Sequence, residues 1–537
     1  MKAFAELLDR LAYEPSRNAK LKLLRAYFCA TPDPARGFAL AAMTGGLVFA
    51  QAKSGLLRTL IVARTDPVLF ALSYDYVGDL SETIALMWPA AAAEPPPTLD
   101  EVVDTLKTLR KADLPAKIAA WLDGLDETGR WALLKLITGS LRIGISARLA
   151  KTAVAEIGGL PANAVEDIWH GLAPPYEALF AWVEGRGPRP ETADPAPFRP
   201  AMLAHALDEK DLETLDPSDF SAEWKWDGIR IQAVAGGGVA RLYSRSGEEI
   251  SNAFPDVAAA LALAREEFAV DGELLVMRDG HVQSFGQLQQ RLNRKTVSAK
   301  LAAQFPAHIR AYDLLAEAGE DTRSLPFTQR RTRLEALVRR LANPRLDLSP
   351  LLEFIGWPDL AQARKNPECA GADAAAVEGL MLKRRDSPYL PGRVKGQWYK
   401  WKRDPFNVDA VVMYAQRGHG KRSSFYSDFT FGVWAGAELV PVGKAYFGFT
   451  DEELVLLDRF VRNNTTNSFG PVREVAHGPD AGLVVEVAFE GLNRSTRHKS
   501  GVAMRFPRFA RIRWDKPVAE ADHIEVLLAM LGAVAPV

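Results

Sequence analysis

A lysine followed two residues later by an aspartate and a glycine is the pattern in this sequence with the clearest chemical potential. It stands in Glu223-Trp-Lys225-Trp-Asp227-Gly228, within an apolar and alternating run typical of a β-strand. The Asp-Gly pair predicts a sharp turn, so the lysine amine would face a pocket rather than bulk water. An amine becomes a nucleophile when burial or neighbouring cations favour its neutral form. Alone the pattern is weak, because K-x-D-G arises by chance in roughly one chain in ten of this length.

Further charged and aromatic residues follow this lysine in a fixed order. Taken singly, each is more often a surface charge or a core aromatic, so the argument rests on their order and spacing together. They are Arg230, Arg245 in YSRSGE, Glu273 in VDGELL, Tyr312 in AYDLL, Glu378 with Lys383 in EGLMLK, Lys400 and Lys402 in WYKWK, and the segment RFPRFARIRWDK from Arg505 to Lys516.

This ordered set resembles the nucleotidyltransferase motifs of ATP-dependent DNA ligases, a superfamily that includes the mRNA capping enzymes. The match runs from Glu223 to Lys516, and the preceding segment GSLRIGIS, residues 139–146, is similar to part of the DNA-binding domain of the larger ligases. The resemblance implies an ATP-dependent enzyme that seals nicks between a 5′-phosphate and a 3′-hydroxyl in duplex DNA. The sequence does not distinguish DNA repair, recombination and replication as its setting.

The resemblance also implies roles for individual residues. Lys225 would attack the α-phosphate of ATP, expel pyrophosphate and hold AMP covalently. Lys400 and Lys402 lie on one face of a strand by their spacing and would reach the same phosphate, while Glu273 and Glu378 would hold Mg²⁺. The predicted ATP and AMP contacts are Glu223 at the base, Arg230, Arg245, Glu273, Tyr312 stacked on adenine, Arg393, Lys400 and Lys402. Lys395 is the alternative to Arg393.

A second group of predicted contacts lies near the C-terminus. By the resemblance it would close over ATP and the departing pyrophosphate, with a hinge just after Lys402, near Arg403-Asp404-Pro405. Pro405 favours extended backbone at that point. The group consists of Arg505, Arg508, Arg513, Asp515 and Lys516.

Hydrophobic patterning divides the chain into a helical, a mixed and a strand-rich part. Helical spacing begins at once, with Phe4, Leu7, Leu8 and Leu11, and five prolines between residues 185 and 200 are typical of a semi-rigid spacer. We therefore predict a multidomain protein: an all-α DNA-binding domain over 1–185, a Pro-rich linker over 186–200, an α+β adenylylation domain over 201–403 and an OB-fold β-barrel over 404–537.

One helix is predicted inside the strand-rich part. Thr450 and Glu453 form a capping box, and Leu454, Leu457 and Val461 follow at the spacing of a buried stripe.

Composition and cysteine content exclude several classes of protein. The 537 residues are 48% hydrophobic and 25% charged, which is ordinary for a soluble globular protein. Two cysteines, Cys29 and Cys369, cannot build a disulfide framework or a four-cysteine zinc module, which predicts a reducing, cytoplasmic setting without zinc. The longest uncharged stretch, residues 37–52, is shorter than the roughly 20 residues of a membrane span. The resemblance implies a monomer.

The net charge of −1 conceals two strongly basic segments. Residues 383–403 and residues 494–516 together hold 16 basic and 2 acidic side chains, whereas the other 493 residues hold 50 basic and 65 acidic ones. Phe506, Phe509 and Trp514 are interleaved in the second segment. The bias predicts contacts with DNA phosphates and binding that weakens steeply with salt.

Four alternatives, from the same or another class of protein, make different demands on the sequence. An NAD-dependent ligase needs a four-cysteine zinc module that two cysteines cannot supply, and a capping enzyme would use GTP and would not need this helical region. An RNA ligase stays open, because recognition of a 2′-hydroxyl is not readable from these motifs. A non-catalytic nick-binding scaffold is disfavoured because every motif lysine and glutamate is present.

Overall fold

A computed structural model describes residues 1–89, 95–139, 141–191, 194–264, 266–292, 294, 297–418, 424–495 and 498–534. The chain divides into two compact units, one made of Met1–Val165, Leu172–Pro190 and Pro405–Val537, the other of Glu166–Gly171 and Glu191–Asp404. Ser140, residues 192–193 and residues 496–497 belong to predicted segments but lie outside the described residues. Among the described helices, none is both long and apolar enough to cross a membrane.

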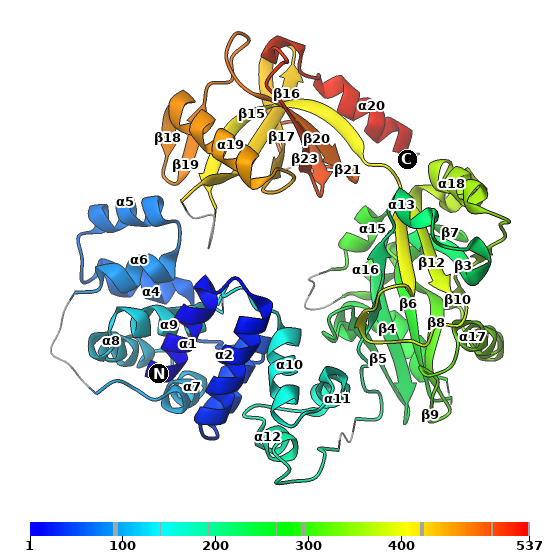
Figure 1. Ribbon diagram of the computed structural model, residues 1–537, viewed down its shortest axis with the longest axis horizontal. Helices are drawn as coiled ribbons and strands as arrows, with labels where there is room; N and C mark the ends of the chain where they lie inside the picture. The colour runs from blue at the N-terminus through cyan, green and yellow to red at the C-terminus, as the bar shows by residue number, and fades with distance from the viewer. Residues whose placement is uncertain are drawn as a thin grey trace. The chain divides into compact units, whose positions relative to one another are not determined.

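The N-terminal region is helical, as its periodicity predicts (Figure 1). Phe4, Leu7 and Leu8 are buried on the first helix. Ser146 caps the tenth helix by accepting a hydrogen bond from the Leu149 amide, 3.2 Å long. The helices are α1 (Lys2–Tyr13), α2 (Arg17–Ala30), α3 (Ala35–Thr44), α4 (Ser54–Val62), α5 (Pro67–Val77), α6 (Leu80–Met87), α7 (Leu99–Thr108), α8 (Leu114–Gly124), α9 (Glu127–Thr138), α10 (Ala147–Ile157), α11 (Ala162–Ile168) and α12 (Glu177–Val183).

The middle region combines two main sheets with short helices. One sheet has the strand order β11-β3-β12-β14-β2, and the other runs β10-β8-β6-β4-β5 with β7 and β9 at its sides. The elements are β1 (Met202–Leu203), β2 (His205–Ala206), α13 (Glu209–Leu212), β3 (Phe220–Trp226), β4 (Ile229–Gly236), β5 (Val239–Ser244), α14 (Pro255–Ala262), β6 (Phe268–Arg278), β7 (His281–Val282), α15 (Phe285–Gln289), α16 (Ala299–Gln304), β8 (Ala307–Glu317), β9 (Glu320–Asp321), α17 (Phe327–Leu341), β10 (Leu346–Leu348), β11 (Leu351–Leu352), α18 (Trp357–Lys365), β12 (Val377–Arg384), β13 (Gly392–Arg393) and β14 (Trp398–Lys402).

The five-stranded sheet has one apolar and one polar face, because side chains alternate along each strand. Trp224 and Trp226 of β3 pack with Leu380 of β12 and Trp401 of β14 in one hydrophobic core. The alternate residues of the same three strands are mostly charged, and they share the opposite face. The lysines and the first glutamate singled out in the sequence all lie on that face.

The Pro-rich segment is more than a spacer. It forms neither helix nor strand in its described part, yet Ala196 and Phe198 are buried in a core of the middle region. The Ala196 carbonyl accepts a 2.8 Å hydrogen bond from the hydroxyl of Tyr243. Proline content indicated the extended backbone but not this docking, because the partner side chains lie more than forty residues away.

The C-terminal region is strand-rich and its main sheet is strongly curled (Figure 1). The long strand β15 pairs with β20 over its first half and with β19 over its second half, while β16 flanks it on the other side. The elements are β15 (Phe406–Arg417), β16 (Tyr426–Ala435), β17 (Glu438–Ala445), α19 (Asp451–Asn464), β18 (Thr465–Phe469), β19 (Val472–Val475), β20 (Val484–Phe489), β21 (Gly491–Arg494), β22 (Val502–Arg505), β23 (Arg508–Arg513) and α20 (Ile524–Val534).

The predicted helix of this region is α19, and its cap is confirmed. Thr450 and Glu453 form the capping box, and Leu454, Leu457 and Val461 are buried. The sequence analysis does not predict the hairpin β18–β19 or the terminal helix α20. The residues of β18 are all exposed, so they carry no alternating hydrophobic pattern.

Candidate active site

Lys225 lies at the end of β3, next to a tight turn into β4. The Asp227 amide ties this turn to the residue before β12 through a 2.7 Å hydrogen bond to the Ala376 carbonyl. A side chain at Gly228 would come within 2.5 Å of the Leu274 carbonyl oxygen, so only glycine fits there. The Lys225 ammonium forms an ion pair with Glu378, and both side chains are about one-fifth exposed, at 22% and 21%. The turn thus presents the amine in a partly buried, ion-paired position.

Strand register places other predicted residues around this amine. Across the sheet, Lys225 and Lys402 flank Gly379, and the next row contains Glu223, Met381 and Lys400. Residues directly opposite one another in a sheet share a face. Since Gly379 has no side chain, nothing on β12 separates Lys225 from Lys402 on this face.

Two carboxylates lie close to Lys225. Glu378 occupies a β-bulge between Val377 and Gly379, a feature that re-aims a side chain. Burial alone would raise the pKa of Glu378, but the Lys225 ammonium outweighs it and holds that pKa below its ordinary value. On β6, burial raises the pKa of Glu273 to about 8, against the attraction of Lys225 and Arg230. The charge of Glu378 contributes to that rise, so the two carboxyl groups are near neighbours.

Five further cations lie near the same position. Burial, followed by the charges of Lys402, Arg393 and Lys225, lowers the pKa of Lys400. Burial also lowers the pKa of Arg245, and the charges of Arg230 and Arg393 add to it. These mutual repulsions mark a concentration of positive charge that an anion would relieve.

Arg230 is fixed by residues that sequence reasoning missed. Its guanidinium donates two hydrogen bonds to the carboxylate of Asp271, at 3.1 and 2.6 Å, and the Tyr389 hydroxyl donates to the same carboxylate at 2.7 Å. Asp271 is two residues before Glu273 on β6, and its side chain is 2% exposed. The sequence does contain a signal for Asp271: it and Glu273 are two residues apart on one strand, so their side chains share a face.

Replacing Asp271 with asparagine should therefore disorient the Arg230 guanidinium while all the cations of the site remain present. We expect the rate of covalent labelling by α-labelled ATP to fall about tenfold, because a planar guanidinium loses its bidentate anchor. Asp321→Asn, which removes a carboxylate anchor of Arg323 (2.7 Å) in the same unit, is the control and should label normally. An unchanged rate for Asp271→Asn would show that Arg230 needs no anchor.

Lys383 contacts both Glu223 and Tyr312. The Glu223 carboxylate forms a buried ion pair with Lys383, and the Lys383 ammonium also donates to the Tyr312 carbonyl at 3.2 Å. Tyr312 itself sits at a β-bulge, skipped in the pairing of β6 with β8. Lys383 was predicted to contact DNA phosphates as part of the first basic segment. That prediction is wrong, since Lys383 is only 1% exposed.

Comparison with known proteins assigns the family. A model for the "ATP dependent DNA ligase domain" matches residues 201–402, and one for the "ATP dependent DNA ligase C terminal region" matches residues 422–516. A probable DNA ligase of Koribacter versatilis is 33% identical over 84% of this chain and 81% of its own length. The chain belongs to the ATP-dependent DNA ligases.

Other relatives agree with this assignment. A probable DNA ligase of Opitutus terrae is 34% identical over 83% of the chain, which spans about half of that protein's length, 50%. The solved structure named Pmar-Lig_PreS3 is 15% identical and superposes with a TM-score of 0.61 over 95% of this ligase and 99% of its own chain, which supports the fold. The predicted enzyme class is confirmed.

The C-terminal motif of the ligase lies in the other compact unit from Lys225. Lys516 and Arg513 both contact one carboxylate oxygen of Asp409, at 2.7 and 3.4 Å, and Arg513 also pairs with Asp515 at 3.0 Å. The two remaining members, Arg505 and Arg508, are half-buried on β22 and β23. Asp409 was not singled out in the sequence, because its partners are about a hundred residues away.

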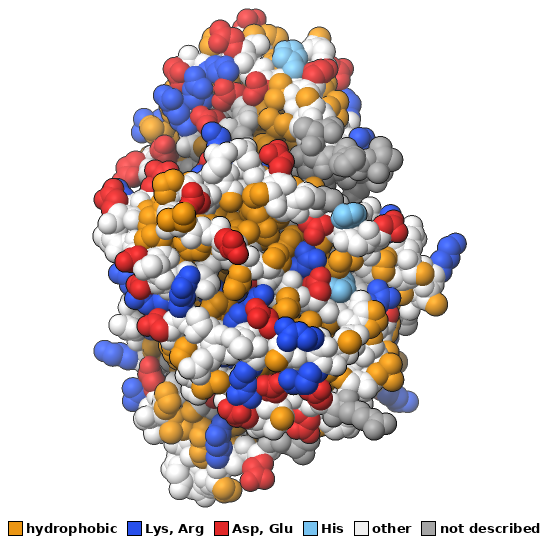
Figure 2. All heavy atoms as spheres, turned by 90° about the vertical axis from the view of Figure 1, so that its right-hand side faces the viewer, with side chains coloured by type: hydrophobic (Ala, Val, Ile, Leu, Met, Phe, Trp, Pro, Cys, Tyr) orange, Lys and Arg blue, Asp and Glu red, His pale blue; other side chains and the backbone are white. Residues whose placement is uncertain are grey.

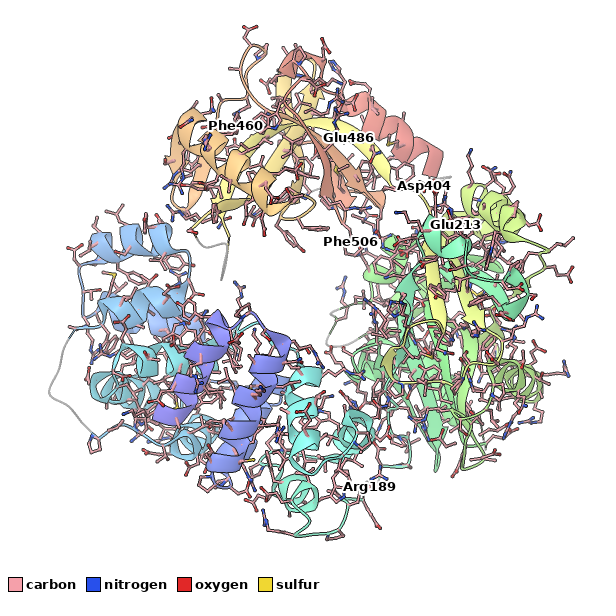
Figure 3. All side chains as sticks on the ribbon, viewed as in Figure 1. Arg189, Glu213, Asp404, Phe460, Glu486 and Phe506 are labelled. Carbon is pink, nitrogen blue, oxygen red and sulfur yellow. The ribbon has the colours of Figure 1, made fainter. Side chains whose placement is uncertain are left out.

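The two basic segments are only partly available to DNA. Arg384 pairs with Asp219 at 2.8 Å, and Arg385 donates to the Phe220 carbonyl at 3.1 Å, so both serve the fold. Phe509 is buried in the C-terminal core. Phe506, labelled in Figure 3, is 62% exposed and Trp514 is 53% exposed. On the face of the molecule in Figure 2, acidic and basic side chains are interspersed.

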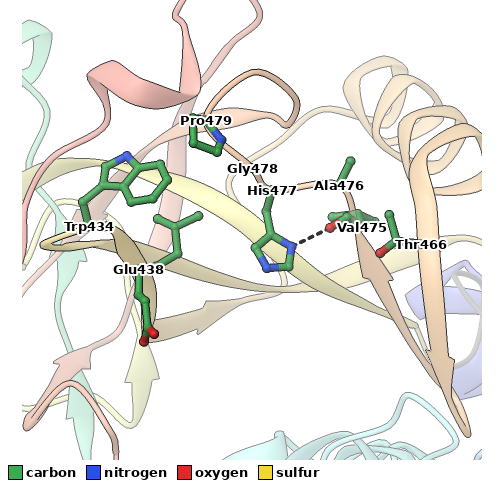
Figure 4. Close-up of a pocket in the computed structure, with 10 residues that line it drawn as sticks. Trp434, Glu438, Thr466, Val475, Ala476, His477, Gly478 and Pro479 are labelled. Carbon is green, nitrogen blue, oxygen red and sulfur yellow. Dashed lines mark hydrogen bonds between the residues drawn. The ribbon is translucent and has the colours of Figure 1, made fainter.

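The C-terminal region also has a cavity of about 560 Å³ (Figure 4). His477 points into it with its Nδ1 atom 2.6 Å from the Val475 carbonyl oxygen. None of the predicted ATP contacts lines this cavity. Its lining includes Trp434, Glu438, Thr466, Val475, His477 and Pro479.

Proposed function

We propose that this ligase seals 5′-phosphate/3′-hydroxyl nicks in duplex DNA through AMP bound covalently to Lys225. The observation that carries the proposal is the Lys225 amine, held by Glu378 at a fixed turn and surrounded by cations. In the first step a bond forms from Nζ to the α-phosphorus, the bond to the β-phosphate oxygen breaks, and pyrophosphate leaves. The 5′-phosphate then takes AMP from the lysine, and the 3′-hydroxyl finally displaces AMP.

Each step places charge on phosphoryl oxygens, so positioned cations stabilise the transition states. Lys400 and Lys402 are the proposed α-phosphate contacts, with Arg245 and Arg393 beside them. Arg393 is preferred over Lys395 because its charge acts on both Lys400 and Arg245. Arg230, anchored by Asp271, would contact the nucleotide or the 5′-phosphate.

Glu273 and Glu378 are the proposed Mg²⁺ ligands. Among the described residues no group of three or more acidic, histidine or cysteine side chains could hold a metal. Two carboxylates nevertheless fit Mg²⁺, which keeps several waters and binds through one or two carboxylates and the substrate phosphates. The raised pKa of Glu273 is also consistent with a metal ligand, because the nearby cations Lys225 and Arg230 do not offset the cost of burying its negative charge. Bound Mg²⁺ would neutralise charge on the phosphates.

Glu273→Gln should raise the Mg²⁺ concentration needed for half-maximal lysyl-AMP formation about tenfold, since the amide is a weaker ligand for a hard cation. The measurement is a Mg²⁺ titration of labelling at saturating ATP. Glu267→Gln, on an exposed loop just before β6, is the control. If Glu273→Gln needs the same half-maximal Mg²⁺ concentration as Glu267→Gln, Glu273 does not bind the metal.

Tyr312 is the proposed stacking partner of adenine, and Glu223 the proposed contact to the edge of the base. Both come from strands of the middle region, so the base would bind beside the phosphate contacts. The burial of Glu223 supports a contact to a base rather than to solvent.

The proposed domains keep the predicted bounds: a DNA-binding domain over 1–185, a linker over 186–200, an adenylylation domain over 201–403 and an OB-fold over 404–537. The separate core of the C-terminal region and the unit boundary between Asp404 and Pro405 support a hinge at that point. The closing contacts would be Arg505, Arg508, Arg513, Asp515 and Lys516. We further propose that the enzyme is a cytoplasmic monomer without zinc.

The test is sealing of a nicked duplex with all-DNA or RNA-containing strands, each supplied with ATP or NAD and with Mg²⁺. We expect efficient sealing only with ATP and a DNA nick. Preference for an RNA strand at the nick would favour the RNA ligase alternative. Binding to the nick without lysyl-AMP formation would favour the non-catalytic scaffold and contradict the proposal.

A further inference from the structure

Lys383 is a charged side chain enclosed in the base-binding side of the proposed site. Its side chain and that of Glu223 are each only 2% exposed. In the sheet, Lys383 stands opposite Ser221 of β3 and Trp398 of β14, on the face that carries Glu223 one row further along. A lysine so deeply buried cannot contact a DNA phosphate, and it needs another explanation.

Aromatic rings and one carboxylate hold the Lys383 ammonium in place. Its nitrogen lies 4.3 Å from the ring centre of Tyr312 and 4.5 Å from that of Trp398. It also donates to the Tyr312 carbonyl at 3.2 Å and pairs with Glu223. Such cation–π contacts are strongest where water is excluded. Lys383 therefore links the proposed base-edge residue, Glu223, to the proposed stacking residue, Tyr312.

The Glu223 carboxylate retains hydrogen-bonding capacity. Both of its oxygens are buried, and within the described residues neither accepts a hydrogen bond with good geometry beyond the Lys383 ion pair. A buried acceptor without a donor is costly, and native proteins rarely leave one unused. Its natural complement is an N–H group of a ligand, and a 6-aminopurine has one on its edge.

We propose that Lys383 fixes the orientation of the Glu223 carboxylate, and thereby makes the base site selective for a 6-amino purine over a 6-oxo purine. The proposal rests on the proposed contact between Glu223 and the base. An ionised carboxylate accepts from a 6-amino group but opposes the carbonyl oxygen of a 6-oxo purine, and such mismatches at buried polar groups discriminate strongly. Without the ammonium, the Glu223 carboxylate loses the ion pair that holds its oxygens in place, so it no longer meets the 6-amino group in a fixed orientation. Lys383 is thus a positioning residue for nucleotide choice.

The experiment compares lysyl-AMP and lysyl-IMP formation from α-labelled ATP and ITP, two nucleotides that differ at purine position 6. In the wild type we expect kcat/KM to favour ATP by at least about 100-fold. Lys383→Met should reduce this preference about tenfold or more, mainly by raising the KM for ATP. Lys210→Met, an exposed lysine of α13, is the matched control and should keep the wild-type preference. Equal loss with both nucleotides at unchanged KM would show a merely structural role and overturn the proposal.

Two further variants separate this inference from the function on which it rests. Glu223→Gln should also lower the preference for ATP. If it does and Lys383→Met does not, the base contact stands and the inference about Lys383 is wrong; if neither changes the preference, the proposed base contact itself is wrong. The double variant Glu223→Gln/Lys383→Met leaves no unpaired buried charge, so it is expected to fold even if Lys383→Met does not. Its ATP preference should equal that of Glu223→Gln alone, and an additive second loss would contradict the coupling.

Discussion

Replacing Lys225 with alanine is expected to abolish covalent labelling of the ligase by α-labelled ATP, a loss of at least about 10³-fold. The reason is that the variant removes the only atom proposed to bond to the α-phosphorus. Glu378, Lys400 and Lys402 would remain, but none of them lies at the end of β3, where Lys225 stands. The measurement is acid-stable label on the protein after incubation with Mg²⁺ and ATP.

The same variant should still act on a nick whose 5′-phosphate already carries AMP, because the last step needs the phosphate contacts and not the lysine nucleophile. We expect this sealing rate to fall far less than the labelling rate. Lys210→Ala, which removes an exposed lysine of the same unit, should leave both rates unchanged. If Lys225→Ala acquired label at the wild-type rate, the covalent intermediate would not form at this residue. If the wild type itself acquired no label, only the scaffold alternative would be left.

The sequence predicts the site best where reactive side chains occur in a local pattern, that is, beside a turn or at the two-residue spacing of a strand. The K-x-D-G turn and the i, i+2 spacing of Lys400 and Lys402 are local patterns, and they are sufficient to place these side chains on one sheet face. Helix caps such as Thr450 were predictable for the same reason, since they involve neighbours three or four residues away. The register that brings Glu378 to Lys225 depends on a bulge and could not be read from spacing.

What sequence reasoning missed depends on burial and on distant partners. A run of basic residues shows charge but not solvent exposure, so Lys383 was grouped with phosphate contacts although it lies in a closed aromatic and carboxylate environment. Asp271 and Asp409 each orient a predicted arginine, yet neither is near its partner in the chain. Such residues become visible only when strand pairing is known, because cross-strand contacts carry no fixed sequence interval.

The second large effect is expected from Lys516→Ala, in the C-terminal motif. If this cation closes over ATP, it neutralises charge on the departing pyrophosphate, which occurs in the first step alone. Lysyl-AMP formation should then slow about 100-fold, whereas sealing of a pre-adenylylated nick should change less than about threefold. Both rates can be measured in single-turnover assays on the same preparation.

The state of Lys516 in the structure sharpens this expectation. Its ammonium is 2.7 Å from Asp409, and Arg513 shares that carboxylate, so the motif is ordered within its own region. Removing the lysine leaves the Arg513–Asp409 contact at 3.4 Å to maintain the fold. Lys444→Ala, which breaks a pair with Asp428 at 3.0 Å in the same region but outside both basic segments, is the matched control and should affect neither step. Equal losses in both steps for Lys516→Ala would instead place this lysine at a group that all three reactions share, such as the α-phosphate or the DNA backbone.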